Sequence, residues 1–354
     1  MSFLKNAWYV GAWASEVTRA LTPRTILNEA VLFYRKTDGS AAAIGGICPH
    51  RFAPLSMGKL VGDDVQCGYH GLQFDCSGKC TGTPIDNKVP AAAKVKSWPL
   101  VEKYNLIWLW MGDPERADES LIPDFSYLLD PGRKILSGVT HVKANYELIV
   151  DNLADLTHTH FLHGNFLHTE AVKQTQHQVL QEGTTIHSKF WFPNGRVPPL
   201  MGKYMDDAEL IVDRWTEIRW DAPATIRLNA GATPTGQPRE DGIQAFGTHL
   251  LTPETEYSTH YFYAHARSFK IDDPATDVLV REWQQVAFNE QDKPMIEAQQ
   301  KILGERELMD MRPVLLATDA GAVRIRRVLK KLIAEENVSG EAQGKAGEVV
   351  ASHG

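Results

Sequence analysis

Short apolar runs separated by turn signals fill the first 110 residues of the chain. The clearest runs lie at residues 31–34 (VLFY), 41–44 (AAAI) and 106–110 (LIWLW). Pairs such as Asp38-Gly39 are typical of the turns between strands. Apolar residues at every third or fourth position, which would indicate helices, are absent from this part. We therefore predict a β-rich domain over residues 1–115.

The pattern after this domain predicts a mixture of strands and helices. A connection containing Pro and Asp occupies residues 121–131. The β-like stretches that follow lie at residues 185–192, 210–220, 224–229 and 260–269. Asp273-Pro274 is typical of a helix start and predicts a helix towards Gln300, kinked near Pro294. These elements predict an α+β fold with a second domain over residues 116–335.

A last helix is predicted over residues 320–334, with one apolar and one basic side. The basic residues are Arg324, Arg326, Arg327, Lys330 and Lys331. We interpret this side as a solvated face rather than a docking site for an acidic partner, because long charged side chains usually reach water. From residue 336 onward Gly, Ala, Ser and Glu dominate, and this composition predicts a flexible tail over residues 336–354.

Charge and composition exclude several classes of protein. The 354 residues carry a formal net charge of −7, and no basic domain stands out, so we expect no nucleic-acid partner. No apolar run approaches the ~18 residues that would cross a bilayer, and the start lacks the long apolar core of a signal peptide. We therefore expect a soluble cytoplasmic protein without a membrane partner.

Residues 145–163 (NYELIVDNLADLTHTHFLH) combine the pattern of a core helix with carboxylates and histidines. The apolar stripe consists of Ile149, Leu153 and Leu156. Asp155 and His158 are three residues apart on another face, where the carboxylate can orient the imidazole. The simpler interpretation is a set of ordinary polar residues on a half-buried helix.

His163 is five positions after His158. In an ideal helix this spacing would separate the two side chains by about 140°. Both can bind one ion only if the helix ends or unwinds near Thr159. Two imidazoles and one carboxylate from elsewhere would then form the facial triad of a non-haem Fe(II) oxygenase.

Two short motifs near the start pair cysteine with histidine. The first is Cys48-Pro49-His50 and the second is Cys67-Gly68-Tyr69-His70. Structural zinc is one interpretation, although zinc fingers usually place two cysteines before two histidines. One cysteine and one histidine per motif suit a Rieske [2Fe–2S] cluster better, because one iron takes both thiolates and the other both imidazoles. Cys76 and Cys80 lie outside the pattern, and we interpret them as ordinary thiols.

These motifs resemble a known family. CPHRFAPLSMG and CGYHGLQFDCSGKC are similar to the Rieske domain of ring-hydroxylating and O-demethylating oxygenases, and residues 145–163 resemble their iron-binding segment. NAWYVGAW, FGTHLLTPET and VLLATDAGAVRIRRVL resemble the branch of vanillate O-demethylase oxygenase subunits and dicamba monooxygenase. The resemblance covers nearly the whole chain.

The resemblance implies a Rieske domain followed by a catalytic domain of the helix-grip type, in which a curved antiparallel sheet wraps a long helix. It also implies a homotrimer with head-to-tail contacts. Asp155 would then lie between His70 of one subunit's cluster and His158 of the next subunit's iron. A carboxylate can accept a hydrogen bond from each imidazole, so Asp155 would join the two centres.

The resemblance further assigns the ligands. Cys48, His50, Cys67 and His70 would hold the cluster, and His158 and His163 the iron. FNEQDKPMIEA offers Glu290, Asp292 and Glu297 for the third ligand, and the family pattern matches Asp292 best. Relatives usually carry an acidic pair here, whereas Gln291 precedes Asp292 in this chain. Asn152 would be a weak fourth contact or a neighbour of the ligands.

For the substrate, the resemblance points to Asn229, His249 and Trp283 as residues that line the pocket. Asn and His can hydrogen-bond a carboxylate or a ring oxygen, and Trp can stack on an arene. Arg227 is a further candidate partner for a carboxylate. Without the resemblance, each of these residues could equally be an ordinary strand or core residue.

The expected function is O-demethylation of a methoxylated, vanillate-like aromatic acid to a phenol and formaldehyde by the oxygenase component, with O2. The chain shows neither G-x-G-x-x-G nor G-x-x-x-x-G-K-[ST], so the two electrons are expected from a separate NAD(P)H-dependent flavin and iron–sulfur reductase. The alternatives are N-demethylation, methyl hydroxylation or ring hydroxylation by a related oxygenase. A Rieske electron carrier without catalytic iron is the alternative from a different class.

Overall fold

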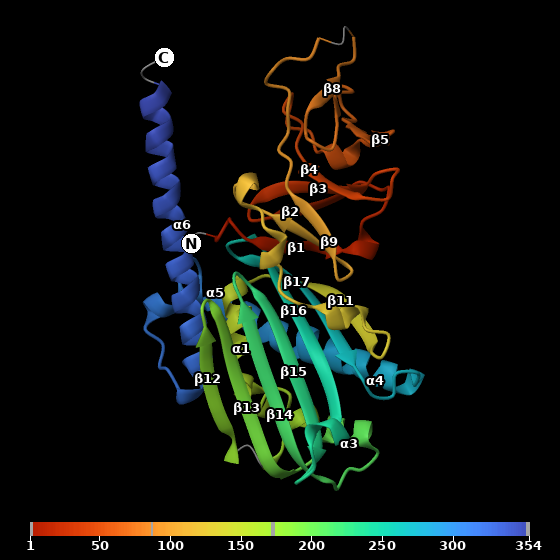
Figure 1. Ribbon diagram of the computed structural model, residues 1–354, viewed down its shortest axis with the longest axis vertical. Helices are drawn as coiled ribbons and strands as arrows, with labels where there is room; N and C mark the ends of the chain where they lie inside the picture. Colours follow the sequence, from red (N-terminus) through yellow and green to blue (C-terminus); the bar gives the residue numbers. More distant parts are fainter. Residues whose placement is uncertain (1–2, 86–87, 171–173, 352–354) are drawn as a thin grey trace. The chain divides into compact units, whose positions relative to one another are not determined.

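The computed structural model describes residues 3–85, 88–170 and 174–351, with side chains described up to residue 339. The chain divides into two compact units (Figure 1). The smaller unit contains Lys5–Ile122 and Thr252–Glu256, and the larger unit contains Pro123–Leu251 and most of the chain from Tyr257 onward. No helix in the described part of the chain has both the length and the apolar character needed to cross a membrane.

The smaller unit consists of three antiparallel sheets. The first orders its strands β1 (Trp8–Trp13), β10 (Leu106–Trp110), β9 (Leu100–Lys103), and the second β2 (Thr22–Ile26), β3 (Glu29–Arg35), β4 (Ala41–Gly45). The third orders them β5 (Lys59–Val61), β6 (Asp64–Gln66), β7 (Gln73–Phe74), β8 (Cys80–Gly82). The predicted runs at 31–34, 41–44 and 106–110 are strands β3, β4 and β10, so the β-rich prediction is confirmed.

Local sequence explains how these strands are joined and buried. All five residues of β10 are buried because this strand lies between β1 and β9. The turn from β9 to β10 contains only Tyr104 and Asn105, with φ of +60° and +61°. Two consecutive positive φ values are the signature of a type I′ hairpin, whose twist matches that of the flanking strands.

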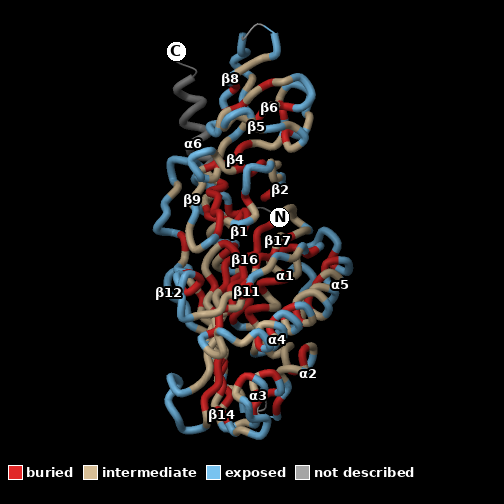
Figure 2. Tube along the Cα trace, turned by 90° about the vertical axis from the view of Figure 1, so that its right-hand side faces the viewer, coloured by how far each residue is buried: buried red, intermediate tan, exposed pale blue. Residues whose placement is uncertain are grey.

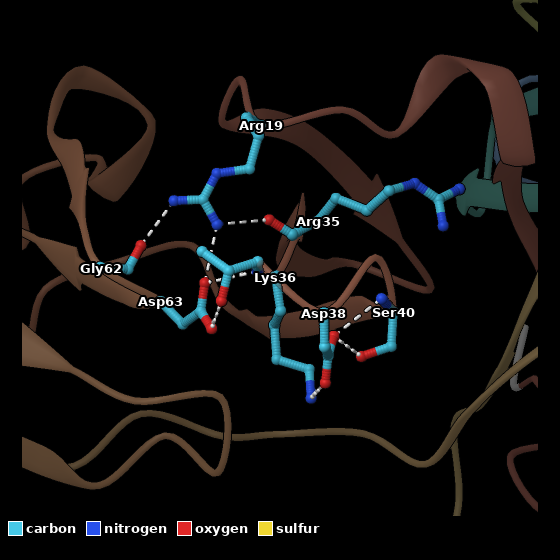
Figure 3. A network of polar contacts seen from close by, with 8 residues as sticks. Arg19, Arg35, Lys36, Asp38, Ser40, Gly62 and Asp63 are labelled. Carbon is cyan, nitrogen blue, oxygen red and sulfur yellow. Dashed lines mark hydrogen bonds and ion pairs between the residues drawn. The ribbon is translucent and has the colours of Figure 1, made fainter.

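A polar network holds the β5–β6 hairpin, which leads directly into Cys67 (Figure 3). The Asp63 carboxylate accepts hydrogen bonds from Arg19 Nη1 at 2.7 Å and from the Thr37 backbone N–H at 2.8 Å. Arg19 also donates to the Gly62 carbonyl oxygen. Because Arg19 and Asp63 are 45% and 35% exposed, their ion pair alone adds little stability, and the network mainly fixes the position of the turn.

The larger unit is built on a seven-stranded sheet whose described pairings are antiparallel. The strands follow one another in the order β11-β17-β16-β15-β14-β13-β12. Their bounds are β11 (Lys134–Val142), β12 (Gln176–Glu182), β13 (Thr185–Arg196), β14 (Ile211–Asp221), β15 (Thr225–Pro234), β16 (Ile243–Thr255) and β17 (Ser258–Arg267). The four predicted β-like stretches fall on β13, β14, β15 and β17, whereas β11, β12 and β16 were not predicted. Strand β16 contains Gly247 and Pro253, which weaken a strand pattern.

Helices cover one face of this sheet (Figures 1 and 2). The helices of the unit are α1 (Tyr146–Ala154), α2 (Gly164–Leu167), α3 (Pro199–Met205), α4 (Pro274–Gln284), α5 (Lys293–Leu303) and α6 (Ala320–Ala351). A π-helix, η9 (Gln285–Asp292), joins α4 to α5. The departure from α geometry expected near Pro294 therefore takes the form of a π-helix in front of it, since proline displaces the carbonyl four residues earlier.

Short 3-10 helices complete the fold. They are η1 (Ala14–Glu16), η2 (Leu55–Met57), η3 (Pro114–Arg116), η4 (Glu119–Leu121), η5 (Ser126–Leu129), η6 (Leu156–His160), η8 (Arg239–Asp241), η10 (Leu308–Met311) and η11 (Ala317–Asp319).

Two expectations for α6 need correction. The backbone stays helical to Ala351, well past residue 334, because Ala, Glu, Gln and Lys in this stretch favour a helix despite three glycines. The basic side is also not wholly solvated. Arg326 is largely buried and binds the carboxylates of Glu147, at 2.7 Å, and Asp151, at 2.6 Å.

Candidate active site

In the smaller unit, the two Cys/His motifs form loops of the same construction. In each loop the cysteine N–H donates to the carbonyl oxygen five residues later, and the cysteine carbonyl accepts from the N–H four residues later. These distances are 2.9 and 2.9 Å for Cys48, and 2.7 and 3.0 Å for Cys67. Phe52 and Gly71, each four residues after its cysteine, have φ of +57° and +75°. The matching turns predict that both loops present their side chains to a common centre.

The four side chains of these loops are arranged with sulfur inside and nitrogen outside. Cys48 and Cys67 are 2% and 3% exposed, whereas His50 and His70 lie at the surface with ring centroids 4.6 Å apart. Burial raises the pKa of the Cys48 thiol, which also interacts with Cys67. Two inner thiols and two outer imidazoles fit a two-iron cluster with one kind of ligand on each iron.

The residue after Cys67 is glycine because the backbone at Met57 passes too close to leave room for a side chain. A Cβ atom on Gly68 would lie 2.5 Å from the Met57 carbonyl oxygen, closer than any real Cβ contact. Of the remaining cysteines, Cys76 is exposed, and Cys80 is buried with its Sγ 3.4 Å from the Gly82 carbonyl oxygen. Neither belongs to the two loops, which agrees with their interpretation as ordinary thiols.

In the larger unit, the segment that contains Asp155, His158 and His163 leaves the α-helix earlier than expected. Helix α1 ends at Ala154, and η6 begins at Leu156. The expected unwinding occurs, but at Asp155 rather than near Thr159. The Asp155 side chain accepts a hydrogen bond from the Thr157 N–H at 2.9 Å, and Asp favours such caps over helix interiors.

This cap changes how His158 is oriented. The Asp155 carboxylate was expected to hold the imidazole, but His158 Nδ1 instead donates to the Asp155 backbone carbonyl oxygen at 2.7 Å. The bond leaves Nε2 of His158 free as a metal ligand. Because the cap uses only Oδ1 of Asp155, the other carboxylate oxygen is available for another partner.

His163 is oriented by a residue that sequence reasoning did not assign. Its Nδ1 donates to the side-chain oxygen of Gln291 at 2.6 Å, and its Nε2 faces Asp292. Gln291 is the position at which this chain departs from the acidic pair that the resemblance implies. That departure was the only feature of the sequence that could have pointed to Gln291 as the partner of His163.

His158, His163 and Asp292 bring their ligand atoms within 4.8 Å of one another, and no other group of three in the described part of the chain does so. Asp292 Oδ1 lies 3.2 Å from His163 Nε2 and 3.7 Å from His158 Nε2. Ligands at right angles around one metal ion, with bonds of ~2.1 Å, are roughly 3 Å apart. The spacing therefore fits a facial triad, and burial lowers the pKa of His158, which favours the neutral ligand form.

The carboxylate of this triad comes from the π-helix η9. Asp292 is 6% exposed, and its Oδ1 accepts a hydrogen bond from Asn152 Nδ2 at 3.3 Å. The other two candidates are engaged elsewhere: Glu290 accepts from Gln285, and Glu297 accepts from the Lys143 N–H. The family-based choice of Asp292 thus agrees with the geometry, and Asn152 contacts this carboxylate as expected.

A cavity of about 150 Å³ opens onto the triad. Its apolar lining includes Leu153, Leu156, Leu167, Phe192, Leu200 and Ile243. Cavities of roughly this size with such a lining can hold a benzene ring. Trp283 also lines the cavity, with its ring edge-on to His163 at 5.3 Å between centroids.

Apart from the triad, polar side chains interrupt the apolar lining, among them the buried His249, Arg214 and Gln284 and the half-buried His265. His249 shares a hydrogen bond of 2.6 Å with the Tyr261 hydroxyl through Nδ1, while its Nε2 has no hydrogen-bond partner among the described residues. Burial lowers the pKa of His249 and of His265 to about 4, so both are neutral at pH 7. His249 and Trp283 therefore lie where they were expected, whereas His265 and Arg214 were missed.

Asn229 and Arg227 lie outside the lining, contrary to expectation. Side chains alternate along a strand, and β15 directs Leu228 and Ala230 towards the cavity. Asn229 is instead bound by its neighbours, accepting from Trp215 Nε1 at 3.2 Å and donating to Glu217 at 3.2 Å. The physical reason is register, because one step along a strand reverses the face.

Comparison with known proteins agrees with this architecture. Residues 7–99 match the model of the Rieske [2Fe-2S] domain, and residues 142–335 match that of the vanillate O-demethylase oxygenase C-terminal domain. Two relatives that are named for their substrates are similar to this chain over nearly their full lengths. The oxygenase component of dicamba O-demethylase from Stenotrophomonas maltophilia is 42% identical, over 94% of this chain and 98% of that protein. The iron–sulfur subunit TsaM1 of the toluene-4-sulfonate monooxygenase system from Comamonas testosteroni is 39% identical, over 95% and 98%.

A solved structure shows the same fold. The crystal structure of dicamba monooxygenase bound to dicamba superposes with a TM-score of 0.89 at 41% identity, covering 96% of this chain and 100% of that one. A fold with a site for a Rieske cluster in one unit and a site for a mononuclear iron in the other defines a class of proteins, the Rieske oxygenase components. The chain belongs to the Rieske non-haem iron oxygenases, in the branch of the vanillate and dicamba O-demethylases.

The family, the fold class and the two metal cofactors expected from the sequence are therefore confirmed. The assignment of individual side chains to each centre stays a prediction, to which the distances above give support.

Proposed function

We propose that this chain is the terminal oxygenase component of a Rieske monooxygenase that O-demethylates a methoxylated aromatic acid. The observation that carries the proposal is the ring-sized apolar cavity that opens directly onto His158, His163 and Asp292. One relative above is named for O-demethylation and the other for the oxidation of toluene-4-sulfonate, an aromatic anion, and these names agree with the proposed reaction and class of substrate.

The reaction balances with O2 and two electrons from outside. One oxygen atom enters a C–H bond of the methoxy group, and the other leaves as water after taking up two protons. The resulting hemiacetal loses its C–O bond to give a phenol and formaldehyde. When bound, the mononuclear iron activates O2 with electrons that the cluster passes on.

The residues of this chain would hold both metals and shield the reaction. Cys48, Cys67, His50 and His70 would hold the cluster, and His158, His163 and Asp292 the iron. The apolar lining excludes water from the cavity. With the Tyr261 hydroxyl donating to Nδ1 of His249, Nε2 carries the proton and donates to an oxygen of the substrate. Trp283 forms a flat wall against which the arene packs.

Electrons would enter from a separate NAD(P)H-dependent flavin and iron–sulfur reductase, in the cytoplasm. We propose a homotrimer in which Asp155 joins His70 of one subunit, through its carboxylate, to His158 of the next, through its backbone carbonyl oxygen. In support, Asp155 and His158 both line an outer groove of about 680 Å³ in the larger unit. Phe161 and Val314, which also line it, are 83% and 90% exposed, as expected of a surface that another subunit covers.

The test is a turnover assay with a compatible reductase over a panel of methoxybenzoates, in which formaldehyde and the phenol are quantified. Formaldehyde equal to the O2 consumed supports the proposal. A cis-diol, an N-dealkylated product or a hydroxymethyl product from matched substrates would assign the chain to one of the related reactions instead. Iron analysis addresses the carrier alternative, since a carrier holds about two irons per chain and the oxygenase about three.

A further inference from the structure

Arg214 on strand β14 is a buried cation that faces the cavity (4% exposed). Its guanidinium stacks over Phe192, with 4.0 Å from Cζ to the ring centroid, and its Nη2 lies 3.5 Å from His160 Nε2. Its Nε has no hydrogen-bond partner in the described part of the chain. A guanidinium has five N–H donors, so most of its capacity is unused by the protein.

No carboxylate of the described residues neutralises this charge. Burial alone acts on Arg214 and lowers its pKa to about 10, which leaves it charged at pH 7. Its neighbour His160 cannot neutralise the guanidinium, because an imidazole is either neutral or positively charged. Keeping an unpaired cation in an apolar cavity costs free energy, which a ligand of opposite charge would recover.

Other buried arginines of the same unit show the usual arrangement. Arg326 is bound by two carboxylates, and Arg267 donates to Asp277 at 2.5 Å. Arg214 differs from both because no carboxylate of the described residues contacts it and because it lines the cavity beside the triad. The contrast indicates that its partner comes from outside the chain.

We infer that Arg214 binds the anionic group of the substrate, a carboxylate or a sulfonate on an aromatic ring. This inference rests on the proposed function and deepens it, because it assigns the residue that selects anions. A planar guanidinium matches the paired oxygens of both groups, and the cavity volume suits one ring between Arg214 and the triad. Binding the anion at Arg214 then leaves a substituent on the ring free to face His158, His163 and Asp292.

The experiment uses the full-length enzyme with both metals and three variants: Arg214→Met, Arg214→Lys and, as a control, Arg227→Met. Arg227 lies on the neighbouring strand outside the cavity lining. The probes are methoxybenzoates, methoxybenzenesulfonates and the neutral methoxybenzamides with the same ring positions. Binding is measured by calorimetry and turnover by formaldehyde, so that Kd, KM and kcat are separated.

We expect Arg214→Met to weaken binding of the anions roughly 100-fold, with the amides within about 3-fold of the unaltered enzyme. Arg214→Lys should recover part of this loss, and Arg227→Met should behave like the unaltered enzyme. Without ligand, Arg214→Met should melt no lower, since it removes an unpaired buried charge. The ratio between benzoate and benzenesulfonate affinity shows which anion the site prefers.

Equal loss for anions and amides together with a lower Tm would show a structural role and overturn the inference. Unchanged anion affinity in Arg214→Met, or no binding of any anion to the unaltered enzyme, would overturn it as well. The two proposals fail separately. Anion binding that depends on Arg214 without any formaldehyde refutes O-demethylation alone, whereas formaldehyde release that ignores Arg214 refutes the anion site alone.

Discussion

The bond between His163 and Gln291 offers a test of how this chain holds its iron. Gln291 precedes the proposed ligand Asp292 in the π-helix, and its side-chain oxygen accepts from His163 Nδ1 at 2.6 Å. Replacing it with methionine keeps most of the volume and removes the acceptor. The Nδ1–H of a 2% exposed imidazole is then left without its partner, and the ring loses the contact that fixes its orientation.

Partners of this kind usually contribute 10–100-fold to metal affinity, or roughly 1.4–2.7 kcal/mol. We place Gln291→Met in this range, because His163 is one of only three proposed protein ligands. Gln291→Glu keeps an acceptor at the same place and makes it anionic, which raises the basicity of the imidazole. This variant should bind iron at least as tightly as the unaltered protein.

The assay is competition between the enzyme and a chelator for Fe(II), starting from protein that retains its cluster but has lost the mononuclear iron. Glu290→Gln is the matched control, because this neighbouring side chain contacts Gln285 rather than the triad. Cluster absorption is recorded in parallel and should not change. Equal iron affinity of Gln291→Met and the unaltered protein would refute the positioning role.

Other substitutions test the remaining structural arguments. Arg326→Met should lower the stability of the larger unit by about 3–5 kcal/mol, measured by thermal unfolding, since it leaves two carboxylates unpaired. Burial already raises the pKa of both carboxylates, so the folded state takes up protons more readily than the unfolded state. The loss of stability in Arg326→Met should therefore shrink as the pH falls from 7 to 5. A loss that does not depend on pH would contradict this argument. Gly68→Ala should lose most of the cluster absorption, whereas Gly82→Ala, whose added Cβ would meet nothing closer than 3.6 Å, should keep it. Cys76→Ser should also keep the full cluster, and loss of absorption would make this exposed thiol a ligand.

Spacing along the chain was enough to predict those parts of the site that depend on local geometry. Because His163 is five positions after His158, both could bind one ion only if the helix broke, and the structure has a break at Asp155. The choice between the carboxylate and the carbonyl of Asp155 as the partner of His158 could not be predicted. That choice depends on which backbone N–H groups in the first turn of η6 lack a partner within the helix and take the Asp155 carboxylate as their cap.

Register explains both the failure at Asn229 and the omission of Arg214. Asn229 was carried over by position, but alternation along β15 turns it away from the cavity. In β14, Val212, Arg214, Ile218 and Trp220 are all buried and occupy positions of the same parity. The sequence alone shows that Arg214 shares its side of the strand with mostly apolar residues. That this side of the strand faces the cavity beside the triad is known only from the pairing of β14 with its neighbours.

Both segments that carry the proposed iron ligands depart from α-helical geometry at or close to those residues. After α1, a 3-10 helix replaces the α-helix between Asp155 and His163, and the π-helix η9 ends at Asp292. A regular helix would direct His158 and His163 to different sides, and an uninterrupted α-helix through residues 285–292 would rotate Asp292 relative to Trp283. The irregular turns cost local stability, which the packing of the surrounding helices and sheet must offset. The triad therefore depends on the folded unit as a whole, and its geometry cannot be deduced from either segment alone.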